Sequence, residues 1–329
     1  MRVLVVTNMW PSAERPHWGA FVKSQADSLG TTGCVNTLYE IQGWRSSRAY
    51  LRALADLPHV ARDCGAELVH AHYGLSGAAA LRVPLPLVVS FCGDDLLGRP
   101  DARGRLSFKS RALIPLSRLA ARRAHGVIVK SSEMAAVLTG IRDVHVIANG
   151  VDLSRFVPEP RDAARAALGW PSDPPVLLFA ADPAEERKNW PLAVAVRDAL
   201  AARGLAIRLE AVHHRPQADM VRAMSAADVL LLPSYHEGSP NVVKEAMAMN
   251  LPVVAAPVGD CRERLRDVTP SAVAERTVEA FAKATSQVLA SGQRSNGREV
   301  IERTLSLAAV AERVRGVYEQ AHARFRGGR

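Results

Sequence analysis

Two glutamates eight positions apart, Glu237 and Glu245, are the side chains of this sequence best placed to do chemistry. They flank the tetrapeptide Gly238-Ser239-Pro240-Asn241, which predicts a helix start, because serine is a good N-cap and proline suits the first helical position. Apolar runs at 228–232 and 251–256 predict a strand on each side. Glu237 then lies in a loop beside the helix N-terminus, and Glu245 lies in the second turn, roughly 7 Å further along.

The N-terminus of such a helix favours an anion, since its first backbone N–H groups have no partner within the helix. A phosphate is the usual anion at this kind of site, and carboxylates are good acceptors for hydroxyl groups. The pattern therefore predicts an extended ligand with a diphosphate in the middle and hydroxyl-rich ends.

The elements that must position these residues alternate between strand and helix along the chain. In the first half, apolar runs predict strands at 3–7, 35–39, 67–72, 85–91, 126–129 and 145–147. A proline-rich stretch at 158–175 predicts a linker, and a second alternation follows it. We expect an α/β protein of two doubly wound parallel-sheet (Rossmann-like) domains, with the ligand in a cleft at the carboxyl ends of both sheets.

Length and composition agree with this organisation. A chain of 329 residues, 48% of them hydrophobic, predicts two domains with large cores. The four cysteines show no metal-like spacing and indicate a reducing compartment. The run MRVLVVTNMW is a strand-length apolar segment and not a signal peptide, and no run approaches the ~20 apolar residues of a membrane helix. We therefore expect a cytoplasmic protein.

Charge is concentrated in the first half of the chain. Residues 1–168 hold 21 Lys and Arg against 14 Asp and Glu, whereas residues 169–329 hold 21 against 19. This excess favours an anionic partner, either a phosphorylated substrate or a lipid surface. Nucleic acid is disfavoured, because aromatic residues make up only 5% of the chain and do not alternate with basic ones.

Several motifs together resemble one known family. The Glu237–Glu245 pair is followed by Ala246-Met247-Ala248 and by Leu251-Pro252-Val253-Val254-Ala255. Further matches, in the same order along the chain, are the Gly19 loop, His70-Ala71-His72, Phe91-Cys92-Gly93-Asp94-Asp95 and Asn149-Gly150-Val151-Asp152. In this pattern the chain resembles the family-4 retaining glycosyltransferases of the GT-B fold, the glycosyl transferases group 1. The resemblance covers nearly the whole chain, and its specific part is the paired-glutamate segment.

The resemblance implies a domain plan and a set of roles. Residues 1–160 would form the acceptor side, 161–305 the nucleotide-sugar domain, and 306–329 a helix that crosses back to the first domain. Glu237 would contact the donor sugar, Glu245 the ribose hydroxyls, and Lys188, helped by Arg187, the phosphates. The remaining donor-site residues would be Gly238, Ser239, Pro240, Asn241, Val242, Gly19 and, through its backbone, His213.

Two positions depart from the family pattern. The family commonly has histidine where Cys92 stands, and a thiol is a poorer hydrogen-bond partner. Either His72 or Asp94 would then supply the sugar contact, or the sugar would differ, or the activity would be reduced. The family also has arginine about five residues before the lysine, where this chain has Asp182 or Pro183. No metal ligand is expected, and the adjacent Asp94 and Asp95 are interpreted as helix capping with a possible sugar contact.

Simpler interpretations stand beside these. Glu237, Glu245 and Lys188 could be solvated surface charges, His72 could be a structural histidine, and Cys92 could be a packed thiol. The basic segment 99–123, with interleaved leucines, could contact an anionic membrane, line a groove for an anionic acceptor, or be a solvated helix face. We expect Pro115 to interrupt it as a helix.

The sequence therefore predicts retaining sugar transfer from a nucleotide-diphosphate sugar, a UDP- or GDP-sugar, to a hydroxyl of a glycan, a lipid-linked acceptor or a small molecule. The protein would act in the cytoplasm or at the inner membrane face, without a permanently bound cofactor. The alternatives are a nucleotide-sugar epimerase of the same fold and a catalytically weak nucleotide-sugar-binding partner subunit.

Overall fold

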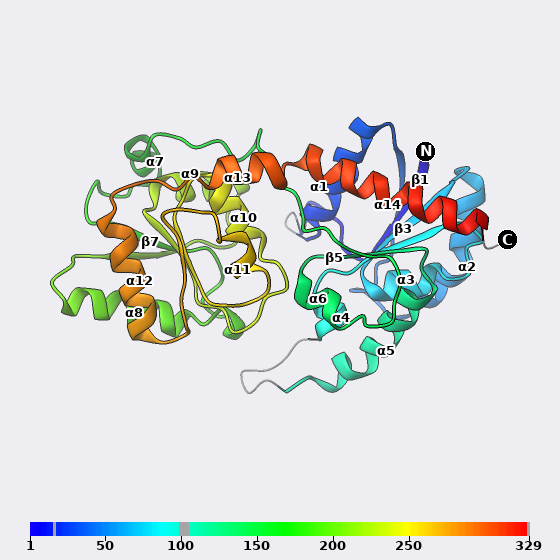
Figure 1. The fold of residues 1–329 in the computed structure, drawn as a ribbon, viewed down its shortest axis with the longest axis horizontal. Helices are drawn as coiled ribbons and strands as arrows, with labels where there is room; N and C mark the ends of the chain where they lie inside the picture. The colour runs from blue at the N-terminus through cyan, green and yellow to red at the C-terminus, as the bar shows by residue number, and fades with distance from the viewer. Residues whose placement is uncertain (16–17, 99–104, 328–329) are drawn as a thin grey trace. The chain divides into compact units, whose positions relative to one another are not determined.

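The computed structural model describes residues 1–15, 18–98 and 105–327, and the chain divides into two compact units (Figure 1). Unit 1 comprises Met1–Gly150 together with Leu307–Arg329, and unit 2 comprises Val151–Ser306. Each unit is an α/β structure built on one parallel sheet, as the alternating sequence pattern predicts.

The sheet of unit 1 has six strands in the order β2-β1-β3-β4-β5-β6, and all neighbours are parallel. The strands are β1 (Arg2–Thr7), β2 (Val35–Glu40), β3 (Leu68–His72), β4 (Leu87–Ser90), β5 (Gly126–Val129) and β6 (Val144–Val146). The helices are α1 (Ala20–Leu29), η1 (Gly30–Thr32), α2 (Arg48–Asp63), α3 (Gly74–Ala80), α4 (Asp94–Leu97), α5 (Phe108–Arg123), α6 (Ser132–Ala136) and α14 (Leu307–Gly327).

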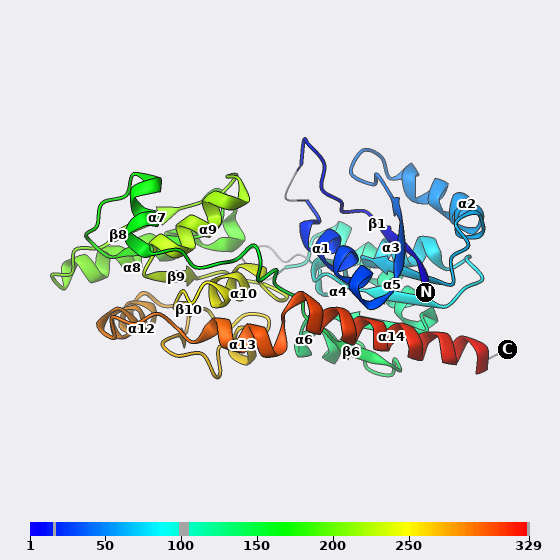
Figure 2. The same cartoon turned by 90° about the horizontal axis from the view of Figure 1, so that it is seen from above.

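Side chains of β3 alternate between the two faces of this sheet. Val69 and Ala71 join the apolar core that includes side chains of α2. His70 points to the other face, where Tyr318 of α14 bonds to it. Helix α14 runs beside α1 there (Figure 2). The last segment of the chain is therefore part of the unit that contains the first strand.

Helix α5 corrects one expectation. Pro115 lies inside it, and the helix is nevertheless continuous over Phe108–Arg123. Proline removes one backbone hydrogen bond and costs about 3 kcal/mol in a helix interior. Packing of α5 against α3 and α4 offsets that cost.

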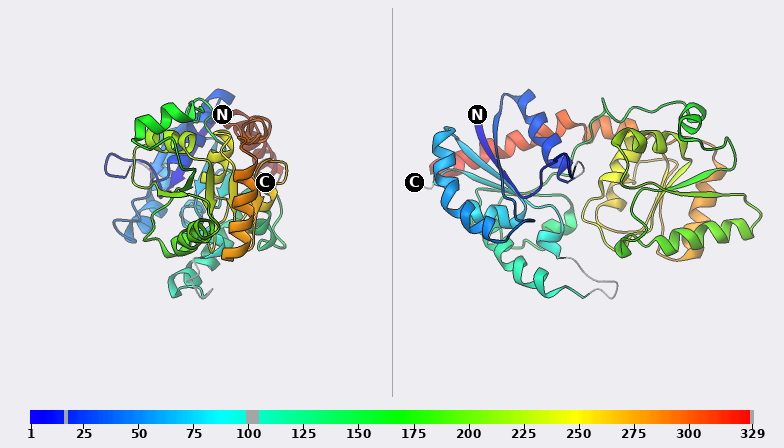
Figure 3. Two further views of the ribbon diagram at one scale, coloured as in Figure 1. Left: turned by 90° about the vertical axis from the view of Figure 1, so that its left-hand side faces the viewer. Right: turned by 180° about the vertical axis from the view of Figure 1, so that it is seen from behind.

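The sheet of unit 2 has five parallel strands in the order β11-β10-β9-β7-β8. They are β7 (Val176–Phe179), β8 (Arg208–Ala211), β9 (Val229–Leu232), β10 (Val253–Ala255) and β11 (Ala272–Val273). The helices are α7 (Arg161–Leu168), η2 (Glu186–Lys188), α8 (Trp190–Ala202), α9 (Gln217–Ala226), α10 (Asn241–Ala248), α11 (Cys261–Arg264), α12 (Val278–Ala290) and α13 (Gly297–Thr304). Helices α8 and α12 pack together on one face, and α9 and α10 lie on the other (Figure 3).

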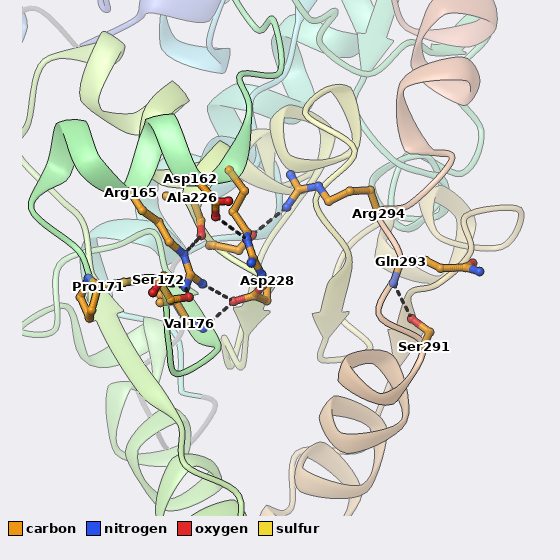
Figure 4. A network of polar contacts seen from close by, with 12 residues as sticks. Asp162, Arg165, Pro171, Ser172, Val176, Ala226, Asp228, Ser291, Gln293 and Arg294 are labelled. Atoms are coloured by element: carbon orange, nitrogen blue, oxygen red, sulfur yellow. Dashed lines mark hydrogen bonds and ion pairs between the residues drawn. The ribbon is translucent and has the colours of Figure 1, made fainter.

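A buried ion pair fixes the amino ends of the central strands of unit 2. The Arg165 guanidinium lies 2.7 Å from Asp228, and its Nε donates to the Ala226 carbonyl (Figure 4). Asp228 also accepts from the Val176 N–H at 2.6 Å, so one carboxylate links α7 to the starts of β7 and β9. Arg294 donates to the Ala227 carbonyl from the far side. Structural contacts therefore occupy the amino ends of these strands, and the candidate ligand-binding residues lie at their carboxyl ends.

Among the described residues, no helix combines the length and apolar character needed to cross a bilayer. Residues 99–104 of the basic segment lie outside the described residues, as do 16–17 of the loop before Gly19.

Candidate functional site

The side chains expected to hold a ligand in unit 2 follow three neighbouring strands. Arg187 and Lys188 lie in η2 after β7, His213 follows β8, and Glu237 precedes α10 after β9. Because these strands are parallel, their carboxyl ends meet at one edge of the sheet, where open α/β sheets bind ligands.

Glu237 is buried, only 9% exposed, and is held by two cations. Its Oε1 lies 2.7 Å from Lys188 Nζ and 3.1 Å from Arg187 Nη1, and it accepts from the Ser234 hydroxyl at 3.0 Å. Burial alone would raise the pKa of this carboxyl, but Lys188 and Arg187 outweigh burial and lower it. The structure thus joins three residues that the sequence analysis had assigned separately to sugar and to phosphate.

Glu185 completes this cluster. Its carboxylate lies 2.6 Å from Arg187 Nε, so the two cations face two anions. Arg187 is also tied through its backbone carbonyl to the Tyr235 N–H at 2.8 Å. These bonds fix the strand-to-helix loop against the segment that carries Glu237.

The start of α10 differs from the expected cap. The helix begins at Asn241 with Pro240 as N-cap and without a side-chain cap bond. Ser239 donates instead to Asp260 at 2.8 Å and accepts from the buried Lys244 at 3.0 Å. Burial raises the pKa of Asp260, and Lys244 partly opposes this. A sequence pattern cannot show this chain of bonds, because its members are up to 21 positions apart.

Backbone also approaches backbone closely beside Gly238. Gly259 has a positive φ of 52°, and a Cβ there would lie 2.4 Å from the Gly238 carbonyl oxygen. Glycine is required at 259 both by this conformation and by this contact. The loop 237–240 is therefore held in place by close packing against the backbone of Gly259.

Glu245 lies on α10 with a half-buried side chain, and burial raises the pKa of its carboxyl to about 7. Lys244 and Arg155 act on it at a distance and lower the pKa only in part. No hydrogen bond or ion pair joins its carboxylate to another described residue. Such a group lacks the donors that a ligand's hydroxyls would provide.

His213 and His214 follow β8, and both rings face Asp182 of the loop after β7. His214 Nε2 lies 3.1 Å from Asp182 Oδ2, and His213 Nδ1 lies 3.9 Å from Asp182 Oδ1. The ligand atoms of these three residues lie within 4.8 Å of one another and could hold a metal ion. Asp182 therefore pairs with imidazoles; with Pro183 it is one of the two residues at the place where the family pattern has arginine.

In unit 1, His72 ends β3 in a buried position, 1% exposed, beside His70. His70 is fixed by Tyr318 at 2.6 Å and by Ser90 at 2.8 Å, and burial lowers its pKa to about 3. The same cause lowers the pKa of His72, whose Nδ1 has no hydrogen-bond partner within the described ranges. His70 is thus structural, and His72 is a neutral imidazole whose buried Nδ1 is left without a partner among the described residues.

The two adjacent aspartates after β4 have different surroundings. Asp95 is buried and accepts from the backbone N–H groups of Gly74, Cys92 and Gly93 at 2.9–3.0 Å. The expected capping is wrong, because α4 begins at Asp94 without a side-chain cap bond. Asp95 instead ties the loop before α4 to the first residue of α3, while Asp94 is exposed. Burial raises the pKa of the Cys92 thiol, which stays neutral.

The sequence analysis missed Lys130, which directly follows β5. It is 2% exposed, its Nζ has no hydrogen-bond partner among the described residues, and burial lowers its pKa. The signal was a lysine at the end of a buried strand, which a sequence alone cannot distinguish from a surface lysine. Gly19, by contrast, has a clear structural role: its φ is 73°, and a Cβ would lie 2.3 Å from the Met9 carbonyl oxygen.

Known protein families match both halves of the chain. The family model described as Glycosyltransferase Family 4 matches residues 1–155, and the model described as Glycosyl transferases group 1 matches residues 176–291. The putative teichuronic acid biosynthesis glycosyltransferase TuaC of Bacillus subtilis is 28% identical over 79% of this chain and 82% of its own. A D-inositol 3-phosphate glycosyltransferase of Saccharomonospora viridis is 27% identical over 79% and 72%.

Solved structures share the fold. Sucrose-phosphate synthase from Thermosynechococcus elongatus superposes with a TM-score of 0.80 at 18% identity, covering 98% of this chain and all of its own. Anabaena Alr3699/HepE, solved in complex with UDP-glucose, superposes with a TM-score of 0.68 at 16% identity over 97% and 99%. The two sheets and these neighbours define the GT-B fold. The chain belongs to the family-4, group 1 glycosyltransferases.

Proposed function

We propose that this glycosyltransferase takes its sugar from a nucleoside diphosphate sugar, a UDP- or GDP-sugar, and transfers it with retention to an acceptor hydroxyl. The observation that carries the proposal is the cluster at one sheet edge of unit 2. Two cations, Arg187 and Lys188, lie against the buried Glu237. On the adjoining helix lies the carboxylate of Glu245, which has no partner in the part of the chain that the structure describes. Cations suit a diphosphate, and acceptor-only carboxylates suit hydroxyl groups.

The cluster supports a division of labour. In the reaction the bond between the anomeric carbon and the diphosphate oxygen breaks, and its electron pair leaves with the diphosphate. Arg187 and Lys188 stabilise the charge that develops there. Glu237 holds Lys188 in place and accepts from sugar hydroxyls. The acceptor oxygen forms the new bond to the anomeric carbon, and its proton passes to the departing diphosphate oxygen. The first N–H groups of α10 add a positive dipole end.

The test combines binding with turnover. Thermal unfolding is measured against UDP, GDP, ADP and their sugars, since a ligand at about 100 times its dissociation constant adds ~2.7 kcal/mol of stability. We expect Glu237→Gln to bind the same nucleotide sugar and to lose most turnover, and Glu245→Ala to lose binding first. Full activity of both variants would overturn the assignment, and NMR of the product's anomeric carbon decides retention.

We also propose that transfer needs no divalent metal, because Arg187 and Lys188 already provide cations beside Glu237. The group of Asp182, His213 and His214 makes this testable. Activity in EDTA should equal activity in added Mg²⁺ or Mn²⁺, and His213→Ala should not change that ratio. Activity that EDTA abolishes and Mn²⁺ restores would reverse the proposal.

A second candidate is a nucleotide-sugar-binding subunit without turnover of its own. It is motivated by the neutral Cys92 thiol and by the carboxylate of Asp182, which stand where the family pattern has histidine and arginine. Donor binding without transfer or hydrolysis over a wide acceptor panel would favour it. Donor conversion to a different sugar without any acceptor would instead identify an epimerase of the same fold.

Peripheral contact with an anionic membrane is proposed for the described part of the basic segment. Helix α5 exposes Leu116 and Leu119, 42% and 39% exposed, beside Arg118 and Arg122. A basic amphipathic surface gains ~1 kcal/mol per basic residue near anionic lipid. Co-sedimentation with phosphatidylglycerol vesicles, lost in Leu116→Ser and absent with phosphatidylcholine, would support it; equal recovery with both lipids would refute it.

A further inference from the structure

Two exposed tryptophans and two arginines form a layered cluster on unit 1. The Arg15 guanidinium lies 4.4 Å from the ring centre of Trp18 and 4.9 Å from that of Trp44. Arg45 lies 4.7 Å from the same Trp44 ring. We call these four residues, Arg15, Trp18, Trp44 and Arg45, the indole–arginine platform.

The platform lies on the ligand-binding edge of the first sheet. Arg15 and Trp18 belong to the loop after β1, while Trp44 and Arg45 belong to the loop after β2. These strands are parallel neighbours, paired for example through Val5 and Leu38, so both loops leave the sheet at its carboxyl edge. This edge is where open α/β sheets bind their ligands.

The platform is anchored to the sheet by polar bonds. Trp18 Nε1 donates to the Asn8 carbonyl at 3.2 Å, and the Asn8 amide donates to the Tyr50 hydroxyl at 2.9 Å. Tyr50 also packs against Gly43, where a Cβ would lie 2.4 Å from its ring. The two loops are therefore held in register, and the platform is preorganised.

The exposure of the platform calls for an explanation beyond internal packing. Trp18 and Trp44 remain 38% and 43% exposed although arginine covers part of each ring. Tryptophan is enriched at binding surfaces, because its ring combines a large apolar face with a polar N–H. The nearby Glu14 is also exposed, and within the described part of the chain it forms no ion pair with Arg15 or Arg45. The guanidinium groups thus keep N–H donors for an external anion.

On the basis of the proposed function, we propose that the platform binds the acceptor, and that the acceptor carries an acidic pyranose. Indole faces stack against the C–H face of a sugar ring, and Arg15 and Arg45 bind its carboxylate or phosphate through paired N–H groups. The inference goes beyond donor chemistry, because it names the class of acceptor and the residues that select it.

The test uses three probes that share one ring and differ at C6. Methyl β-D-glucoside has a hydroxyl there, methyl β-D-glucuronide has a carboxylate, and methyl β-D-glucoside 6-phosphate has a phosphate. Binding to the intact chain is followed by tryptophan fluorescence and by saturation-transfer NMR. We expect the acidic probes to bind about fivefold more tightly than the glucoside, which corresponds to one exposed ion pair. The order of the two acidic probes identifies the anion.

Variants separate the two parts of the platform. Arg15→Gln should reduce the preference for the acidic probes and leave glucoside binding nearly unchanged, while Trp44→Ala should weaken all three. The matched control is Trp170→Phe in unit 2, where Arg208 lies 6.0 Å from the indole ring, and it should change nothing. An equal affinity for all three probes, or a preference that survives Arg15→Gln, refutes the inference.

Donor binding is measured on the same samples. If a nucleotide sugar still shifts the unfolding temperature while no glycoside binds, the acceptor inference is wrong and the proposed function stands. If glycosides bind with the expected preference and no nucleotide sugar does, the proposed donor function is wrong instead.

Discussion

Replacing Glu245 by glutamine should make the protein more stable at alkaline pH and lower its affinity for the donor. The carboxyl is half-buried without an ion-pair partner among the described residues, and burial raises its pKa from about 4.5 to about 7. An acid whose pKa is higher in the folded protein destabilises that state once it ionises. The penalty is absent below pH 4.5, grows between the two pKa values, and is complete above pH 7.

The size of the effect follows from the shift. One pKa unit corresponds to about 1.4 kcal/mol, so a change from about 4.5 to about 7 gives roughly 3 kcal/mol at pH 8. Glutamine has the same shape and no charge, so Glu245→Gln should gain about that amount at pH 8, less the cost of its own buried amide. At pH 4 the parent carboxyl is uncharged, so the gain should be absent there and only the small cost of the amide should remain.

Urea unfolding at pH 4, 6 and 8 measures this, with Glu299→Gln as control, since Glu299 is 70% exposed. The same shift predicts that a donor whose hydroxyls bond to the carboxylate releases a proton on binding. Its affinity in the parent should rise up to tenfold per pH unit below pH 7 and level off above it. In Glu245→Gln the pH dependence should be lost.

The reasoning would be refuted if the variant were less stable than the parent at pH 8 but as stable as the parent at pH 4. That result would mean that the carboxylate is stabilised in the folded state. A pH-independent donor affinity in the parent would separately show that Glu245 does not meet the ligand.

Two further predictions rest on the surroundings of the same loop. Glu237→Gln should destabilise the protein by about 2–3 kcal/mol at pH 7, because two cations lose their anion. The pKa of Glu237 is lowered in the folded state, so its carboxylate stabilises that state above pH 4.5, and this stabilisation is lost as the pH falls through the lowered pKa. The difference in urea midpoint between the parent and Glu237→Gln should therefore shrink at pH 3. A difference that stays constant with pH would show that the ion pairing is not responsible. Gly259→Ala should lower the free energy of unfolding by about 2–4 kcal/mol, since a Cβ would lie 2.4 Å from a carbonyl oxygen. The control is Gly292→Ala, at a φ of 62° with nothing within 4 Å, which should cost only about 1 kcal/mol. Equal losses of stability in thermal unfolding would contradict the importance of the close contact at Gly259.

Much of the candidate site could be found from local sequence. The alternation of apolar runs predicted parallel α/β sheets, because strands buried on both faces need a continuous apolar sequence. Glu237 and Glu245 could be singled out because they lie on one loop and the helix that follows it, where eight positions of spacing fix their separation. Helix and strand periods are local properties, so local residues encode them.

Other features depended on segments that meet only in the folded chain. Local sequence could not predict that Glu237 pairs with Lys188 across 49 positions, or that the Ser239 hydroxyl bonds to Asp260 instead of capping a helix. It also could not predict that Lys130 is buried without a hydrogen-bond partner among the residues that the structure describes. Pro115 stays inside a helix because tertiary packing outweighs a local cost.

The sequence by itself determined the family, the strand order along the chain and the residue types beside the ligand. Only the tertiary structure decided which charges neutralise one another and which remain available. The reason is physical: a side chain's charge state and hydrogen bonds depend on burial and on distant neighbours. Glu237 and Glu245 are both glutamates and lie on one short segment, yet their surroundings shift their pKa values in opposite directions.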